Sequence, residues 1–264
     1  MLRILVPVDF SDTSKNALRY AAHLFEGSKL EITVLHIFGA KSTALMMKSI
    51  DSILIKEAKS QMSALIKEME TESPEVYFKS KLAKNYAVST IANMGNSGNY
   101  DFIVMGTKGV SGLKEVFMGS VAGGVVSKTS VPVIVVPLDY KFESLNNLVF
   151  AVGDDAISDE TVIKPLKTLL EAHNSNLEIL HISENVAPDF ETMLGPLMEL
   201  DPKLTHKSGN GELNRQLNFH INNNDTDLLC LLRTKKSFLN RLFSGSVTLK
   251  QTFNTSVPLL IIHE

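Results

Sequence analysis

Residues 106–120 read GTKGVSGLKEVFMGS and are the most informative part of the chain. An apolar run, Asp101–Met105, comes directly before them, and a second glycine-rich run, Val121–Val126, comes directly after them. A short apolar run bounded by glycine-rich segments is typical of a buried strand that ends in a turn. The pattern therefore predicts a strand, a flexible loop and the first turn of a helix, which is a repeating unit of α/β folds.

The glycines of this loop favour a ligand that carries phosphate. Gly106, Gly109 and Gly112 can adopt positive φ and have no Cβ, so a bulky polar group can lie against the backbone. The next helix is expected to begin at Gly119-Ser120, where the first N–H groups lack intrahelical partners and the helix dipole favours negative charge. A flexible connector without a ligand is the simpler alternative for the same glycines.

The spacing of these glycines differs from the common phosphate motifs. Gly119 and Gly124 have the spacing of a P-loop, but Val125 stands where that motif needs lysine. The dinucleotide pattern G-x-G-x-x-G does not occur in the stretch either. The pattern that does occur is G-x2-G-x9-G-[ST], which is formed by Gly106, Gly109, Gly119 and Ser120.

Length and composition indicate two globular domains. The chain has 264 residues, which the usual domain size divides into two parts of about 130 residues. The formal net charge is −3, so no basic surface argues for a nucleic-acid partner. No apolar run approaches the roughly 18 residues that cross a bilayer, and Pro7 and Asp9 interrupt the N-terminal run too early for a signal peptide. We therefore expect a cytoplasmic protein without a membrane partner, and the single Cys230 is expected to be a core thiol.

Strand and helix patterns alternate along the first half of the chain. Strands are expected at 3–9, 30–38, 76–82, 101–105 and 131–137. Helices are expected from Ser11 or Asp12 to Gly27, and at about 44–71, 86–95 and 119–129. Such alternation needs crossover connections, so the sheet is expected to be parallel and doubly wound. In that architecture ligands bind beyond the carboxyl ends of the strands, and Asp9, His36 and the loop after Met105 all lie there.

Two details of the helices are open to test. Ser11 or Asp12 is expected to cap the first helix, and Asp9 has the alternative role of a cap without any ligand. The long helix at 44–71 is expected to turn one apolar face inward. That face consists of Leu45, Ile53, Leu54, Ala58, Met62, Leu65 and Ile66.

The second half of the chain repeats the first. Ser130-Val131-Pro132 recurs as Ser256-Val257-Pro258 at an offset of 126 residues, and Gly119-Ser120 recurs as Gly245-Ser246 at the same offset. His36 recurs as His181 at an offset of 145 residues. The second copy has therefore lost about 19 residues after its second strand, and the long helix is the expected place of the loss. The domains are expected at 1–139 and 146–264, with 139–147 as the linker.

The two copies differ at the positions that would hold a ligand. At the offset of 126 residues, bulky side chains replace the three loop glycines, namely Leu232, Lys235 and Phe238. Pro7–Asp9 becomes Ala151–Gly153, although Asp154 can replace Asp9 after a shift of one residue. Only Gly245-Ser246 remains of the motif, so the second copy is not expected to bind nucleotide in the same way.

With these motifs the chain resembles the universal stress protein family, in its ATP-binding branch. The resemblance is strong over 2–138 and weak over 147–263. It implies two tandem doubly wound α/β domains of the Rossmann-like, adenine nucleotide alpha hydrolase type, each with a five-stranded parallel sheet and helices on both faces. It also implies that domains pair through their last strands, 133–137 and 259–262, either within one chain as a pseudo-dimer or between chains as a homodimer.

The resemblance assigns binding roles to individual residues. Asp9 resembles the family's acidic residue near the adenine and ribose. Pro7, Val8 and Ile37 resemble the walls of the family's adenine pocket. Met105 stands at the position where the resemblance implies an apolar contact to the base or ribose. The ribose and phosphate cradle corresponds to Gly106, Gly109, Gly119, Ser120 and Val121. Lys108 is not fixed in the family motif but lies within the loop, and Mg2+ would bind through the nucleotide phosphates with few protein ligands.

The function implied is that of a stress-response regulatory protein that holds ATP or AMP in its first domain and has no catalytic residues. A slow ATP hydrolase is the first alternative, but it needs a positioned base or metal, and the loop offers no recognisable catalytic pair. A scaffold without nucleotide, which uses only its sheet edges, is the second alternative. The intact motif of the first copy speaks against the scaffold.

Overall fold

The computed structural model of the chain describes residues 1–38, 47–107, 119–154, 156–157, 160–183, 186–208, 213–233 and 256–263. Internal contacts divide it into two compact units, with the division between Phe142 and Glu143. Both units are α/β, and the predicted fold class is confirmed. None of the helices within these residues has the length and apolar composition needed to cross a bilayer.

Unit 1 alternates strands and helices along the chain. Its strands are β1 (Leu2–Val8), β2 (Leu30–Phe38), β3 (Tyr77–Lys84), β4 (Phe102–Gly106) and β5 (Val133–Val136). Its helices are α1 (Asp12–Leu24), α2 (Met47–Glu72), α3 (Ala87–Gly95) and α4 (Ser120–Val126). All strands pair in parallel in the order β3-β2-β1-β4-β5. The chain therefore builds the sheet outward from β1 in one direction and then from β4 in the other.

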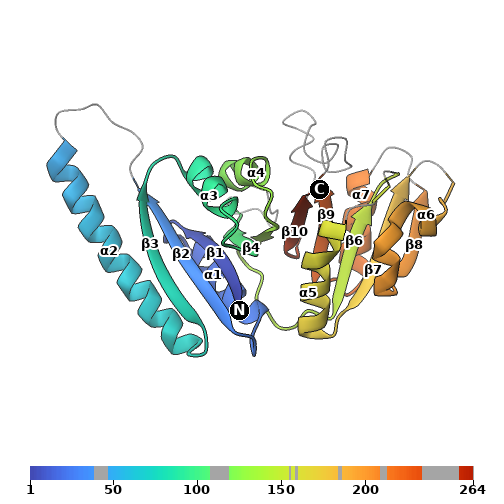
Figure 1. Cartoon of the computed structure of the whole chain (residues 1–264), viewed down its shortest axis with the longest axis horizontal. Helices are drawn as coiled ribbons and strands as arrows, with labels where there is room; N and C mark the ends of the chain where they lie inside the picture. The colour runs from blue at the N-terminus through green and yellow to red at the C-terminus, as the bar shows by residue number, and fades with distance from the viewer. Residues whose placement is uncertain are drawn as a thin grey trace. The chain divides into compact units, whose positions relative to one another are not determined.

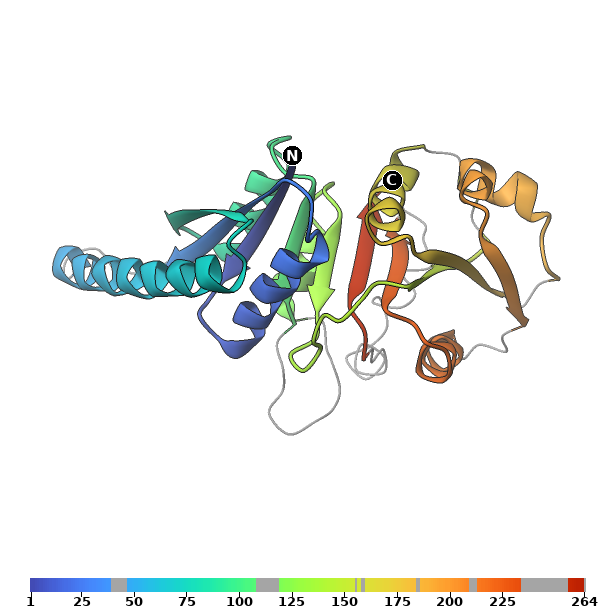
Figure 2. The ribbon, with the colours of Figure 1, turned by 90° about the horizontal axis from the view of Figure 1, so that it is seen from below.

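The helices of unit 1 cover both faces of its sheet. Helices α1 and α2 lie on one face, and α3 and α4 lie on the other (Figure 2). The central strands are fully buried between these layers, as Leu5 in β1 and Ile103 in β4 show with no exposed surface. Gly124 lets the two short helices approach, because a Cβ there would lie 2.8 Å from Cγ2 of Val88. This double covering explains why the strands read as nearly continuous apolar runs.

The start of α1 is fixed by a serine cap. Ser11 is the N-cap, and its hydroxyl accepts a hydrogen bond from the N–H of Ser14 at 3.3 Å. Asp12 then places a negative charge in the first turn, where the helix dipole favours it. Of the two predicted caps, Ser11 and Asp12, the structure therefore has Ser11.

The second helix departs from the predicted inward face. Ala58, Met62 and Leu65 are buried as predicted, but the side chain of Ile53 is 64% exposed and that of Leu54 is 40% exposed. The prediction was wrong for these two residues because α2 continues past the end of the sheet, which Figure 1 shows. Ile66 is half-buried, and Leu45 lies outside the described residues. Helical periodicity predicts which side of a helix is apolar, not how much of its length finds a partner.

Unit 2 repeats the strand order of unit 1. Its strands are β6 (Asn147–Val152), β7 (Asn176–Ser183), β8 (Lys203–Ser208), β9 (Leu228–Arg233) and β10 (Leu259–His263). They pair in parallel in the order β8-β7-β6-β9-β10. Helices α5 (Ile163–His173) and α6 (Phe190–Leu194) cover one face, and α7 (Leu213–Asn223) covers the other (Figure 2). Two short 3-10 helices, Glu160–Val162 and Gly195–Leu200, complete the described elements.

The covering helix after the second strand differs in length between the two units. The 26-residue α2 of unit 1 corresponds in order to the 5-residue α6 and its following 3-10 turn in unit 2. The registers around the deletion still agree, since Val8 pairs with His36 in unit 1 and Val152 pairs with His181 in unit 2. The duplication therefore kept the sheet and shortened one covering helix.

Candidate functional site

The candidate site lies where the strand order of unit 1 reverses. Strands β1 and β4 are neighbours, with Ile4 opposite Phe102 and Leu5 opposite Ile103. The chain leaves these two strands toward opposite sides of the sheet, so the connections after them separate and leave space at their carboxyl ends. Asp9 follows β1 and Thr107 follows β4. The fold thus brings two segments about 100 residues apart to one edge.

Asp9 is held in its ionised form by the turn that follows it. Its Oδ1 accepts the hydroxyl of Ser11 at 2.5 Å and the N–H of Ser11 at 3.1 Å. Partial burial alone would raise the pKa of Asp9, but the hydrogen bonds from Ser11 and Ser14 hold that pKa below its ordinary value. Asp9 is therefore not the N-cap of α1. Its role is to orient Ser11, which is the N-cap.

Two aromatic rings stand beside Asp9. Phe10 has a φ of 66°, an uncommon conformation for a bulky residue, and its ring lies 4.4 Å from the ring of His36. Nδ1 of His36 lies 2.8 Å from the carbonyl oxygen of Val8, so it donates to that carbonyl and leaves Nε2 as the acceptor nitrogen. Sequence reasoning missed Phe10, since no local pattern announces a positive φ at a phenylalanine.

The predicted pocket walls lie on the three neighbouring strands β1, β2 and β4. Pro7 is opposite Leu35 on β2, and both Pro7 and Ile37 are half-buried. Val8 and Met105 are buried, with 4% and 5% of their surfaces exposed. Val8, Pro7 and Met105 therefore lie at the ends of the neighbouring strands β1 and β4, as the site prediction requires.

Gly106 packs so closely against Thr13 that no side chain fits at this position. A Cβ at this position would lie 2.5 Å from Cγ2 of Thr13 and 2.7 Å from its carbonyl oxygen. Its φ is not positive, so Gly106 does not use the left-handed conformation that a glycine permits. The missing side chain lets the first turn of α1 pack directly on the end of β4, and this contact depends on two residues far apart in the sequence.

Thr107 carries a buried hydroxyl that has no hydrogen-bond partner among the described residues. The residue is 4% exposed, its N–H donates to the carbonyl of Val136 at 3.1 Å, and its Oγ1 has no hydrogen-bond partner within the described structure. Leaving such a group unpaired costs about 1–3 kcal/mol. Unpaired buried groups are uncommon and call for a physical explanation, of which a bound ligand is one. Thr107 lay inside the quoted loop but was not among the predicted contacts.

The start of α4 is the remaining described part of the predicted cradle. Gly119 is the N-cap with φ −60° and ψ 160°, and no side chain caps the helix there. Ser120 is exposed, and Val121 is 39% exposed. The first N–H groups of α4 are thus free of side-chain caps, as an anion site needs. Lys108 and Gly109 lie outside the described residues, so their roles stay predictions.

The described part of the corresponding edge of unit 2 carries different side chains. Leu232, which takes the place of Gly106, is buried at 7% exposure. Asp154 faces His181, with 3.0 Å between Oδ1 and Nε2, and Oδ2 accepts the hydroxyl of Ser183 at 2.9 Å. The carboxylate that could replace Asp9 is therefore already engaged, which fits the expected difference between the copies.

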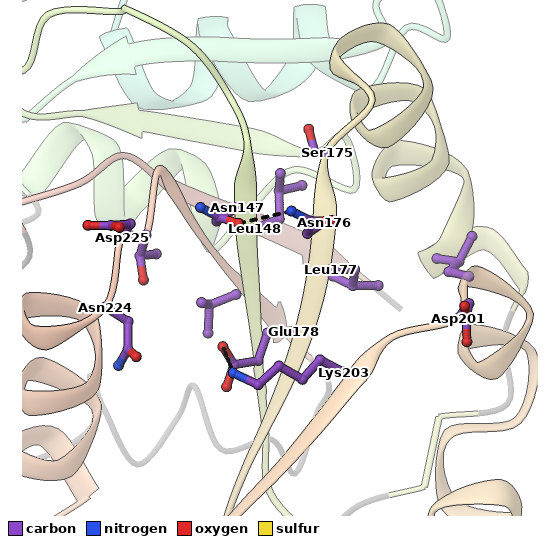
Figure 3. A pocket seen from close by; sticks show the side chains of 13 residues that line it. Asn147, Leu148, Ser175, Asn176, Leu177, Glu178, Asp201, Lys203, Asn224 and Asp225 are labelled. Atoms are coloured by element: carbon purple, nitrogen blue, oxygen red, sulfur yellow. Dashed lines mark hydrogen bonds and ion pairs between the residues drawn. The ribbon is translucent and has the colours of Figure 1, made fainter.

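A cavity of about 570 Å³ lies at the opposite edge of unit 2, at the amino ends of its strands (Figure 3). Its charged lining consists of Glu178, Asp201, Asp225 and Lys203, so acidic groups outnumber basic ones. Burial would raise the pKa of Glu178, but a hydrogen bond from Thr205 at 2.6 Å and the nearby Lys203 hold it below its usual range. An ionised carboxylate repels phosphate, so we place the candidate nucleotide site at β1 and β4 of unit 1.

Comparisons with known proteins agree with this reading of the fold. A model of the Universal stress protein family matches residues 1–137. The chain is 29% identical over 155 residues to a universal stress protein of Methanocaldococcus jannaschii, and the match covers 51% of this chain and 93% of that protein. It is 27% identical over 146 residues to universal stress protein YxiE of Bacillus subtilis, with coverage of 51% and 97%.

Solved structures of universal stress proteins include ones that align with both units. A universal stress protein from Archaeoglobus fulgidus matches with a TM-score of 0.72 over 99% of this chain and 96% of that chain, at 17% identity. At that identity the match shows a shared fold. Together with the family match over the first half, it confirms the resemblance drawn from the sequence, and the chain belongs to the universal stress protein family.

Proposed function

We propose that unit 1 binds an adenine nucleotide, ATP or AMP, beyond the carboxyl ends of β1 and β4, and that nucleotide occupancy regulates the protein in a stress response. The single observation that carries this proposal is Thr107, whose buried hydroxyl at the end of β4 has no partner among the residues that the structure describes. A phosphate or ribose oxygen at this edge would supply that partner. Membership of the universal stress protein family and the G-x2-G-x9-G-[ST] spacing also support the proposal.

The residues present fit such a ligand. Oδ1 of Asp9 accepts hydrogen bonds from Ser11, and the residue is exposed at this edge, so a ribose hydroxyl can donate to its carboxylate. The uncapped N–H groups at the start of α4 suit phosphate oxygens. Pro7, Val8, Ile37 and Met105 offer apolar surface for a base. In this proposal the protein binds and orients the nucleotide, Gly109 and Lys108 complete the phosphate cradle, and Mg2+ is held by the phosphates.

The proposal can be tested through the hydroxyl of Thr107. At a nucleotide concentration of a thousand times Kd, binding should add about 4 kcal/mol to the stability of the full chain. Thr107→Val should weaken ATP binding about tenfold, because one hydrogen bond to a charged group is lost. The same variant should keep or gain stability without ligand, because the hydroxyl it removes is unpaired. Calorimetric titration and thermal melting measure the two effects.

A matched control exists in unit 2. Thr226 also has a buried hydroxyl without a partner in the described structure and is 8% exposed. Thr226→Val should leave ATP binding unchanged. Absence of any stabilisation by ATP, ADP or AMP would contradict nucleotide binding, and equal binding by wild type and Thr107→Val would remove Thr107 from the site.

Three further expectations belong to the same proposal. Pairing through the last strands of the units, as a pseudo-dimer or a homodimer, can be checked by light scattering of the full chain. Cytoplasmic location can be checked by cell fractionation. Phosphate release that depends on Asp9 or Lys108 would favour the slow hydrolase over the regulatory protein.

A further inference from the structure

Four polar side chains form a continuous chain at the carboxyl ends of β6, β7 and β8 in unit 2. Ser183 donates to Oδ2 of Asp154 at 2.9 Å, and Oδ1 of Asp154 lies 3.0 Å from Nε2 of His181. Nδ1 of His181 lies 3.0 Å from Nδ1 of His206 on the neighbouring strand. His181 is fully buried, whereas His206 is half-buried. The chain of bonds therefore runs from the interior toward the outer strand β8.

The partners determine where the protons lie. Nε2 of His181 faces a carboxylate, so it carries a proton and donates it to Asp154. In neutral His181 the other nitrogen, Nδ1, is then an acceptor, and His206 must donate its own Nδ1 proton to it. If Nε2 of His206 gains one proton, the hydrogen bonds from His206 to His181 and from His181 to Asp154 stay the same. The negative charge of Asp154, on the other side of His181, offsets the added positive charge. The arrangement thus tolerates one positive charge.

A second added proton breaks the pattern. With both imidazoles doubly protonated, two N–H groups would face each other across 3.0 Å, and two positive charges would share a mostly buried site. Besides Asp154 and His206, the described neighbours of His181 are the neutral Ser183 and the ring of Phe190, which lies edge-on at 5.7 Å. No second carboxylate among the described residues compensates the added charge.

The titration of His181 has a definite sign. Burial lowers the pKa of His181, the facing His206 lowers it further, and Asp154 opposes both. Its pKa in the folded protein is therefore below its value of about 6.5 in the unfolded chain. The corresponding stability is fully present above about pH 6.5 and is lost as the pH falls below that value, because the unfolded chain then binds more protons.

The described part of unit 1 has no such pair of histidines at the corresponding register position. His36 occupies the register position of His181, but its partner across β3 is Leu82, where unit 2 has His206. His36 instead bonds to the backbone of its own strand pair. We propose that the Asp154–His181–His206 chain is an acid-sensitive switch, which releases the carboxyl end of β8 from β7 when both imidazoles become protonated.

Hydrogen exchange of the full chain tests this switch. We compare β8 (Lys203–Ser208) with β3 (Tyr77–Lys84) at pH 7.5 and 5.0, after correction for the intrinsic effect of pH on exchange. Protection of β8 should fall at least tenfold more than protection of β3. In His206→Gln the side-chain amide can still donate to His181 but gains no charge, so the excess loss should disappear. His23→Gln, which removes an exposed imidazole from α1, should keep it.

A second measurement does not depend on any variant. Imidazole NMR signals of His181 in the wild-type chain should titrate at a lower pH in the folded than in the unfolded protein, because burial and the facing His206 lower its pKa. A His181 midpoint at or above that of the unfolded chain would overturn the proposal. So would a pH response of β8 no larger than that of β3, or one that His206→Gln retains.

Discussion

The two units of this protein have the same sheet and different carboxyl edges. In unit 1 the end of β4 carries Gly106 and the hydroxyl of Thr107, which has no partner in the described part of the chain, whereas in unit 2 the buried Leu232 takes the position of Gly106. The acidic group of unit 1, Asp9, accepts hydrogen bonds from Ser11 in its own turn, whereas Asp154 in unit 2 is bonded through both oxygens to His181 and Ser183 on the next strand. Strand order and register survive in both, so a few side chains at the strand ends, rather than the scaffold, separate a candidate binding edge from a closed one.

The helices after the first strand of each unit show the same contrast. Helix α1 begins at the Ser11 cap, which Asp9 orients. Helix α5 follows a 3-10 turn, and its N-cap position, Val162, makes no side-chain cap. The candidate binding edge of unit 1 is therefore connected to the start of α1, and changes near Asp9 should affect folding as well as any nucleotide binding there.

Copying unit 2 into unit 1 at the end of β4 should have the largest effect. Gly106→Leu forces a side chain into Thr13, whose backbone would lie 2.7 Å from the new Cβ. Overpacking of this kind should lower the free energy of unfolding by about 3 kcal/mol and abolish nucleotide binding. Urea unfolding followed by exchange in unit 1 peptides measures the loss. Gly98→Ala, where a Cβ meets open space but φ is 75°, should cost only about 1 kcal/mol. Equal losses in both variants would contradict the packing role of Gly106.

Removing the cap of α1 should have an intermediate effect. Ser11→Ala deletes the N-cap and a hydrogen bond to Asp9, so stability at pH 7 should fall by about 1 kcal/mol. The lowered pKa of Asp9 stabilises the fold above its unfolded value of about 3.9, and this part is lost as the pH falls through the folded value. The gap between wild type and variant should therefore narrow in acid, as urea unfolding at pH 7 and pH 3 will show.

A serine that is not an N-cap serves as the control for this variant. Ser89 in α3 is half-buried, and its hydroxyl donates to the carbonyl of Tyr86 at 3.2 Å. Ser89→Ala should change stability by only a few tenths of a kcal/mol. If Ser11→Ala proved no more costly than Ser89→Ala, the link between Asp9 and the helix start would be unimportant for stability.

The smallest effect is expected in the core, where the two units are most alike. Cys230 in β9 corresponds to Val104 in β4, and neither has exposed surface. Cys230→Val should change the melting temperature little, with a cost under about 1 kcal/mol. Burial raises the pKa of the Cys230 thiol, so a thiol reagent should not label the native protein until it unfolds. Rapid labelling of the native chain would place Cys230 at the surface.

Local patterns in the sequence were sufficient for most of the fold. The second strand was expected at 30–38 and lies at Leu30–Phe38, because β-branched apolar runs have a short-range signature. The last helix of the first copy was expected at about 119–129 but ends at Val126, since Ser127 closes it through its backbone N–H. The register match of His36 and His181 could also be read from the repeat alone.

The candidate site could be predicted only in part from the sequence. Asp9 and Met105 could be placed at strand ends from the alternation of elements. The reason for Gly106 depends on Thr13, the unpaired state of Thr107 depends on burial, and the conformation of Phe10 depends on the turn after β1. Each of these is a three-dimensional relation, and a residue pattern records the residue type without its surroundings.

The overhang of α2 has a consequence for handling the protein. The buried stripe of this helix starts at Ala58, while Ile53 and Leu54 before it remain exposed. Helical turns without a packing surface fray readily, because most helical stability in proteins comes from packing. Brief digestion with a protease should therefore first cut the part of α2 before Ala58. The remainder, anchored by Met62, Leu65 and Met69, should stay on the sheet and resist further cleavage.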